Sequence, residues 1–184
     1  MTLLLGFAPI AAFILLARFS LSLALWIAFA AAFSLGIRAF VELGAPRAFD
    51  TAMTLLFGLL ALYRGFVDPG MRLAWIGLII ELGLLLTVLW SLVNKAPFTR
   101  QYALAPILSE YGGEQFFIRT NYLLSAVWAL SFAVMAAMDA LTLFVHTLPA
   151  GTLAFVGLAA FLAALAFSWY ASLETGRRIG KRVY

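Results

Sequence analysis

Long apolar runs separated by short polar intervals dominate the pattern of this chain, and one polar interval, residues 94–121, is much longer than the others. About 20 consecutive apolar residues are needed for a helix to cross the hydrocarbon core of a bilayer. The pattern therefore predicts an all-α fold, a polytopic transmembrane helix bundle of six helices in a single transmembrane domain, 1–184. The apolar segments that define it are 3–17, 21–37, 51–63, 73–93, 122–138 and 153–173.

The first segment is the least regular of the six. It is short for a crossing, contains Pro9 and is followed at once by Arg18. It lacks the basic stretch and the small-residue cleavage site of a signal peptide. We expect a short or tilted transmembrane helix whose Arg18 side chain reaches the membrane interface. The alternative is a re-entrant or interfacial segment, which leaves five crossings.

Composition fits a membrane protein and excludes several kinds of site. Of the 184 residues, 65% are hydrophobic and 11% charged, with a mean hydropathy of +1.06, whereas a soluble domain is about half apolar and a quarter charged. There is no cysteine and one histidine, His146, so thiolate and multi-histidine metal sites are excluded within the chain. No cofactor is expected. We attribute the net charge of +4 to topology signals rather than to nucleic-acid binding.

Basic residues are unevenly divided between the two ends of the expected helices. With six crossings, nine of the 12 lysines and arginines fall on one side and three (Arg18, Arg64 and Arg72) on the other. Because basic residues mark cytoplasmic loops, the interval 94–121 and the C-terminus should be cytoplasmic in a bacterial inner membrane. The nine are Arg38, Arg47, Lys95, Arg100, Arg119, Arg177, Arg178, Lys181 and Arg182.

Glu81 is an acidic residue deep inside the fourth segment. It lies roughly 12 Å along the expected helix, at 1.5 Å per residue, where a carboxylate costs at least about 2.5 kcal/mol. Its helix face also carries Gly70, Ala74 and Gly77, small residues that let another helix approach closely. Glu81 is either a proton- or substrate-handling carboxylate or a structural group held by a hydrogen bond or an arginine. The lack of a second intramembrane acid favours the structural role.

The fifth segment carries a polar helix face. Its members are Asn121, Ser125, Trp128 and Asp139, which fall on one side at 100° per residue. The face is either the wall of a groove or ordinary helix packing. Asp139, near the non-cytoplasmic end, is expected to be solvated. It is the one nearby ligand for His146, so no metal site is expected there.

The central interval is the largest candidate surface on the cytoplasmic side. It combines basic and aromatic residues, which suit a surface for a partner or for lipid headgroups. Residues 102–111 are expected to form a short amphipathic helix interrupted at Pro106, and 114–119 a second short element. The candidate surface residues are Lys95, Phe98, Arg100, Tyr102 and Arg119.

Three short motifs stand out along the chain. They are Phe-Ala-Pro at 7–9, Lys-Ala-Pro-Phe-Thr-Arg-Gln-Tyr-Ala at 95–103, and an Asn at 121 followed by Ala-Val-Trp-Ala at 126–129. With these motifs the chain resembles the intracellular septation protein A family of bacterial inner-membrane proteins. The resemblance implies a non-enzymatic protein of cell-envelope maintenance, associated with the division or elongation machinery, and it brings no catalytic residues.

The leading functional hypothesis is a membrane scaffold or adaptor whose partners are the lipid bilayer, membrane proteins of envelope synthesis or division, or further copies of this chain. The alternatives are a small transporter, channel or lipid-handling protein that uses Glu81, or an accessory subunit of a larger membrane complex. An enzyme is not expected, because the sequence has no histidine–carboxylate set, nucleophile elbow or phosphate-binding glycine loop.

Overall fold

A computed structural model describes residues 5–102, 115–145 and 149–180. All regular secondary structure in these residues is helical, which confirms the all-α fold class. A 3-10 helix, η1 (Phe98–Tyr102), follows α5. The α-helices are α2 (Ala8–Leu16), α3 (Leu21–Leu43), α4 (Ala48–Phe66), α5 (Leu73–Val93), α7 (Gln115–Phe144) and α8 (Ala150–Gly180).

Local sequence sets several of the helix ends. At the start of α3, the Ser20 hydroxyl oxygen accepts a hydrogen bond from the Leu23 N–H at 3.4 Å. The helix ends at Gly44, whose φ of 72° suits a residue without a side chain. Between α4 and α5, the Gly70 N–H donates to Asp68 Oδ1 at 3.0 Å in a tight turn. These short connections fold successive helices back on one another.

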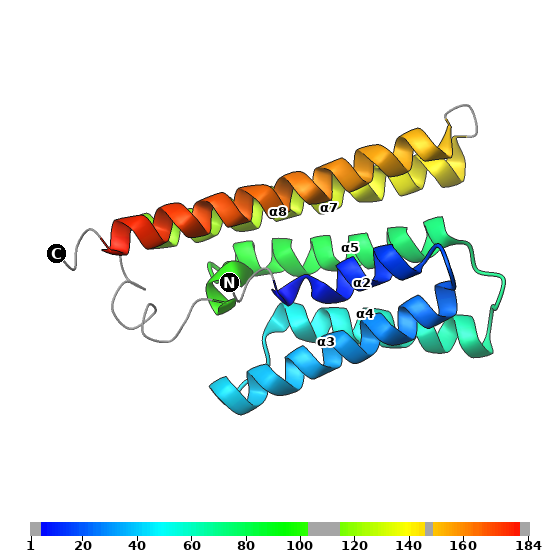
Figure 1. The fold of residues 1–184 in the computed structure, drawn as a ribbon, viewed down its shortest axis with the longest axis horizontal. Helices are drawn as coiled ribbons and strands as arrows, with labels where there is room; N and C mark the ends of the chain where they lie inside the picture. The colour runs from blue at the N-terminus through cyan, green and yellow to red at the C-terminus, as the bar shows by residue number, and fades with distance from the viewer. Residues whose placement is uncertain (1–4, 103–114, 146–148, 181–184) are drawn as a thin grey trace.

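Successive helices alternate in direction along one bundle axis (Figure 1). The α7–α8 hairpin packs on one side of α5, and the α3–α4 pair packs on the other. The connections α3–α4 and α5–η1, together with the end of α8, lie at one end of the bundle, which we call the η1 end. The connections α2–α3, α4–α5 and α7–α8 lie at the opposite end.

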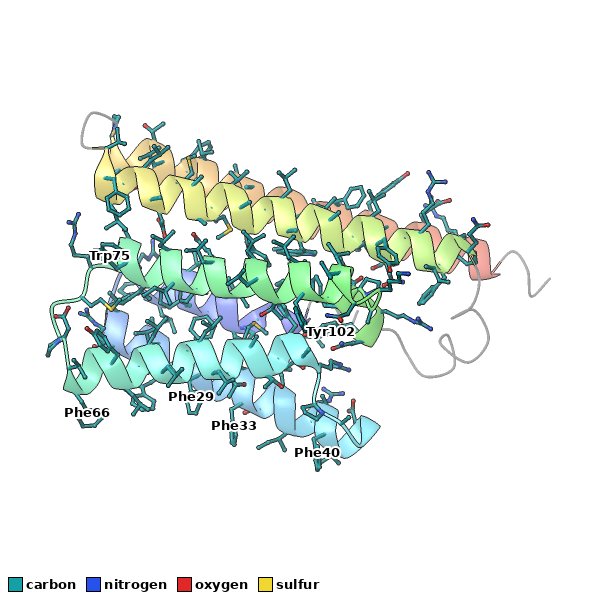
Figure 2. All side chains as sticks on the ribbon, turned by 180° about the vertical axis from the view of Figure 1, so that it is seen from behind. Phe29, Phe33, Phe40, Phe66, Trp75 and Tyr102 are labelled. Carbon is teal, nitrogen blue, oxygen red and sulfur yellow. The ribbon has the colours of Figure 1, made fainter. Side chains whose placement is uncertain are left out.

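Four helices, α3, α5, α7 and α8, are long and apolar enough to cross a membrane. Since α3 and α5 run in the same direction, the chain must return between them through α4, whose 19 residues extend about 28 Å. Figure 2 shows Phe33, Phe40 and Phe66 on the outside of the bundle, where they are 50%, 57% and 81% exposed. Exposed rings of this kind suit contact with lipid. The chain is a multi-pass membrane protein.

The first apolar segment forms the short helix α2. Its nine residues extend about 14 Å, roughly half the thickness of the hydrocarbon core. Pro9 lies in its first turn, where a missing N–H costs nothing. Pro9, Ile10 and Phe13 are buried among the other helices. α2 is therefore an internal element of the bundle, too short to cross the membrane by itself.

The core of the bundle near the η1 end is an aromatic cluster made of Phe7, Phe49, Phe98, Trp128, Phe132 and Phe161. Phe7 lies at its centre. Its ring stacks on Trp128 with centroids 3.6 Å apart and meets Phe49 edge-on at 5.3 Å. It also lies 6.4 Å from both Phe98 and Phe161. The start of α2 is thereby packed against α4, η1, α7 and α8 at once.

Candidate functional site

Glu81 lies on the side of α5 that packs against α7. Gly77, one turn before it on the same buried face, touches the Asp139 carboxylate of α7. A methyl group at position 77 would overlap that carboxylate, so the missing side chain lets Asp139 reach α5. Side chains on a helix lean towards its N-terminus. The Glu81 side chain therefore leans back towards Gly77 and the Asp139 carboxylate that lies against it.

Among the described residues, Glu81 shows no arginine partner and has one unpaired carboxylate oxygen, which differs from the structural role predicted for it. It is 8% exposed, and its Oε2 is buried without a hydrogen-bond partner among the described residues. The ion pairs found in that part of the chain join Arg38 to Glu42 and Arg47 to Asp50, so none involves Glu81.

The expectation that Asp139 is solvated is wrong. Its side chain is half-buried against α5, because Gly77 leaves room for it there. Two acids therefore lie in the α5–α7 interface where the sequence pointed to one.

Buried hydrogen bonds join η1 to α5 and α7. The Thr99 hydroxyl lies 2.9 Å from Asn121 Oδ1, 3.0 Å from the Asn121 carbonyl oxygen and 3.2 Å from Ser125 Oγ. On the other side, the Phe98 N–H donates to Ser91 Oγ of α5 at 3.2 Å. We call η1 with these contacts, and with those to α4 described next, the η1 junction.

A second set of contacts joins η1 to the start of α4. The Tyr102 hydroxyl donates to Asp50 Oδ1, and Arg47 Nη1 lies 3.7 Å from Asp50 Oδ2. The Arg47 guanidinium lies 4.7 Å from the centre of the Tyr102 ring, and its Nε donates to the Gln101 carbonyl at 3.0 Å. The Ala48 N–H, free at the start of the helix, donates to Gln101 Oε1 at 2.9 Å.

The Tyr102 phenol is held in its protonated form at this junction. Burial raises the pKa of Tyr102 well above its ordinary value, and the neighbouring Asp50 carboxylate adds to the rise. The hydroxyl therefore remains a hydrogen-bond donor to Asp50 at neutral pH.

The residues predicted to form a partner or lipid surface fall into an exposed group and a buried group. Lys95, Arg100 and Arg119 are exposed, and we call them the basic rim. Phe98 and Tyr102 are 0% and 3% exposed, so the prediction that they lie on the surface is wrong. Phe98 belongs to the aromatic cluster, and Tyr102, labelled in Figure 2, packs against Gly6 and bonds to Asp50 of α4.

Of the two secondary-structure elements predicted within residues 94–121, the structure describes one. The expected helix 102–111 lies outside the described residues, apart from Tyr102 in η1. The expected short element 114–119 is not separate, because α7 begins at Gln115 and runs on through the apolar segment.

The predicted polar face of α7 packs against other elements. Asn121 and Ser125 bond to Thr99, as described, and Asp139 lies on α5. The Trp128 Nε1–H donates to Ser168 Oγ of α8 at 2.9 Å. Each of the four side chains thus contacts a neighbouring segment, as in ordinary helix packing.

Sequence reasoning missed the roles of Asp50, Thr99 and Gly77. Asp50 follows Arg47 at the spacing of an i,i+3 ion pair, which could have marked it as a partner. Thr99 lies within the motif 95–103 and could have been singled out there. Gly77 was noted for close approach, but nothing in its surroundings along the chain points to Asp139.

No group of three or more acidic or histidine side chains that could hold a metal ion occurs in the part of the chain that the structure describes. His146 lies outside that part. Comparisons with protein-family models, curated proteins and solved structures found no match for this chain. The features that bear on function are Glu81 with Asp139, which we call the acid pair, together with the η1 junction, the basic rim and the short motifs.

Proposed function

We propose that this chain is a non-enzymatic bacterial inner-membrane protein that serves as a scaffold in cell-envelope maintenance or septation. The η1 junction carries the proposal. Buried hydrogen bonds fix η1 to α4, α5 and α7, so η1 is a packed part of this end of the bundle. The motif 95–103, which underlies the resemblance to the intracellular septation protein A family, supplies Phe98, Thr99, Gln101 and Tyr102 of this junction.

The basic rim is the surface we assign to the partner. Lys95 precedes η1, Arg100 lies within it between Thr99 and Tyr102, and Arg119 lies in the first turns of α7; all three side chains are exposed. Held on a rigid base, such charges would meet an acidic cytoplasmic segment of a membrane protein of division or envelope synthesis with little loss of conformational entropy.

We further propose that the η1 end faces the cytoplasm. Of the basic residues in the described helices and connections, three (Arg18, Arg64 and Arg72) lie towards the opposite end. The others lie towards the η1 end, which is the asymmetry expected of a cytoplasmic face. They are Arg38, Arg47, Lys95, Arg100, Arg119, Arg177 and Arg178.

A pair of C-terminal reporter fusions tests this orientation. Because α8 ends at the η1 end, green fluorescent protein fused after residue 184 should fluoresce, and alkaline phosphatase at the same position should be inactive. Fusions at position 69, in the α4–α5 connection, should give the reverse pattern. Active phosphatase at the C-terminus would overturn the proposed orientation.

Neutralising the basic rim should weaken partner association without unfolding the bundle. The double substitution Lys95→Gln and Arg100→Gln removes two exposed charges, each worth up to about 1 kcal/mol in an ionic contact. We expect recovery of division or envelope-synthesis proteins, co-purified in mild detergent from the native host and counted by mass spectrometry, to fall about threefold or more.

The matched control is Arg72→Gln together with Arg18→Gln, which removes two charges from the opposite end. This variant should recover partners at the wild-type level. Equal recovery by both double variants would contradict docking at the basic rim, as would recovery of the wild-type chain without any envelope protein.

A further inference from the structure

The acid pair of α5 and α7 is not explained by a scaffold. Glu81 lies roughly 12 Å from the start of α5, in a helix that is long and apolar enough to cross the membrane. Asp139 meets the same helix one turn away, against Gly77. Two negative charges this close in a medium of low dielectric constant repel each other strongly, and burial has removed most of the hydration of Glu81 and part of that of Asp139.

Among the described residues, no ion pair joins a basic group to Glu81 or Asp139. On α4, Arg64 donates to Ser22 Oγ and to the Met71 carbonyl oxygen, and Asp50 accepts from Tyr102. These contacts hold Arg64 and Asp50 at the two ends of α4, away from Glu81.

The described charged residues of the other elements packed on α5 lie towards the ends of that helix. η1 carries Arg100 and Tyr102 beyond the far end of α5, and Arg119 and Tyr122 lie in the part of α7 that faces η1. On α5 itself, Arg72 precedes the helix at the opposite end. Among the described charged groups, Asp139 is the one that lies against the face of α5 that carries Glu81.

The second observation is the buried carboxylate oxygen of Glu81 that lacks a hydrogen-bond partner. The side chain is more than nine-tenths buried, and its Oε2 has no hydrogen-bond partner among the described residues. A buried, unpartnered carboxylate oxygen is strongly destabilising unless a positive group neutralises it. Since the helix geometry directs this carboxylate towards Asp139, the missing partner belongs between the two acids.

We propose that Glu81 and Asp139 together bind one small cation in the α5–α7 interface, either a proton or a hard monovalent metal ion such as Na⁺. Carboxylate oxygens suit both, because a proton can be shared between two carboxyl groups and hard cations prefer oxygen ligands. Gly77 provides the space that brings Asp139 to the site. One bound cation leaves the pair with a single negative charge.

Reaction with an apolar carbodiimide tests this proposal on the intact protein in detergent micelles. Dicyclohexylcarbodiimide modifies carboxyl groups that carry a proton, and peptide mass spectrometry locates the product. In choline chloride at neutral pH, protons are the one available occupant. We expect Glu81 or Asp139 to be modified at least about tenfold faster than Glu42, an exposed acid paired with Arg38, because an ordinary exposed glutamate is almost fully ionised at that pH.

Replacing choline by Na⁺ separates the two occupants. Slower modification in Na⁺ identifies the metal ion as a competing ligand, and an unchanged rate identifies the proton as the sole occupant. Modification of both carboxyl groups no faster than Glu42 in choline chloride would overturn the proposal. This comparison needs no variant, so it holds even if substitutions at the pair prevent folding.

Two variants then test whether the acids act together. In Asp139→Asn, we measure the proton concentration that gives half-maximal modification of Glu81, or the Na⁺ concentration that gives half-maximal slowing of that modification. This concentration should rise at least about tenfold, because one of two negative ligands is gone. Glu42→Gln, which removes an acid outside the interface, should leave that concentration unchanged. An unchanged concentration in Asp139→Asn would show that Glu81 binds its cation without Asp139 and would also overturn the proposal.

Discussion

Replacing Phe98 by alanine is expected to lower the free energy of unfolding by about 3–5 kcal/mol, the usual cost of truncating a large aromatic side chain in a protein core. The ring is fully buried and stacks on Phe49 with centroids 4.7 Å apart. It also meets Phe7 and Tyr102 edge-on, at 6.4 Å in each case. Truncation would leave a cavity where α4, η1 and the start of α2 come together.

Unfolding of the purified protein in mixed micelles, titrated with sodium dodecyl sulfate, measures this loss. The control is Phe66→Ala, which removes a ring that is 81% exposed and should change stability by no more than about 0.5 kcal/mol. If the Phe98 variant unfolded at the wild-type detergent fraction, the ring would not be packed as described. Loss of partners in this variant would report unfolding, so it cannot serve as a docking test.

The sequence predicted the membrane-spanning helices better than their ends. The segment 73–93 coincides with α5, whereas α7 begins at Gln115, well before the segment 122–138. Hydropathy reports which residues tolerate lipid, but a helix continues for as long as its backbone hydrogen bonds are made. Polar residues such as Gln115 and Arg119 are compatible with both helix and water, so they extend α7 beyond the apolar limit.

The surroundings of Phe98 and Tyr102 could not be predicted from the sequence. Aromatic residues next to basic ones are typical of a membrane surface, where rings lie among headgroups and charges face phosphate. The same residue types also suit a buried junction, where rings pack and polar tips bond to other helices. The choice depends on Asp50 and Phe49, which are distant in sequence and become neighbours only in the folded chain.

The position of Asp139 beside Glu81 could not be predicted from the sequence either. The helical wheel placed Glu81 on the small-residue face of α5, and Gly77 lies on that face. Asp139 was assigned to the end of its segment and to solvent, since the apolar run stops just before it. Its burial follows from the way α7 packs on α5, which depends on two whole helices rather than on the residues around Asp139.

Removing the Tyr102 hydroxyl should destabilise the bundle almost as much as truncating Phe98. Asp50 is fully buried, and its hydrogen bond in the described residues comes from Tyr102. The remaining contact is with Arg47, whose Nη1 lies 3.7 Å from Asp50 Oδ2, beyond hydrogen-bonding distance. We expect Tyr102→Phe to lower the free energy of unfolding by about 2–4 kcal/mol, because it leaves a buried carboxylate short of a partner.

The pH dependence of this loss follows from the protonation of the Tyr102 phenol. Because the pKa of Tyr102 is raised in the folded protein, the contribution of the phenol is fully present below the ordinary tyrosine pKa of about 10 and is lost only as the pH rises through the higher folded value. The stability difference between wild type and Tyr102→Phe should therefore stay constant between about pH 7 and 9.

A double-mutant cycle completes the test. Adding Asp50→Asn to Tyr102→Phe should recover part of the loss, since a neutral amide is cheaper to bury unpaired than a carboxylate. Tyr63→Phe removes an exposed hydroxyl from the same helix as Asp50, α4, as a matched control, and should shift stability by no more than about 0.5 kcal/mol. Equal losses of unfolding free energy in Tyr102→Phe and in the double variant would mean that the buried Asp50 carboxylate is not stabilised by Tyr102. The attachment of the η1 junction to α4 would then depend on Arg47 and Gln101.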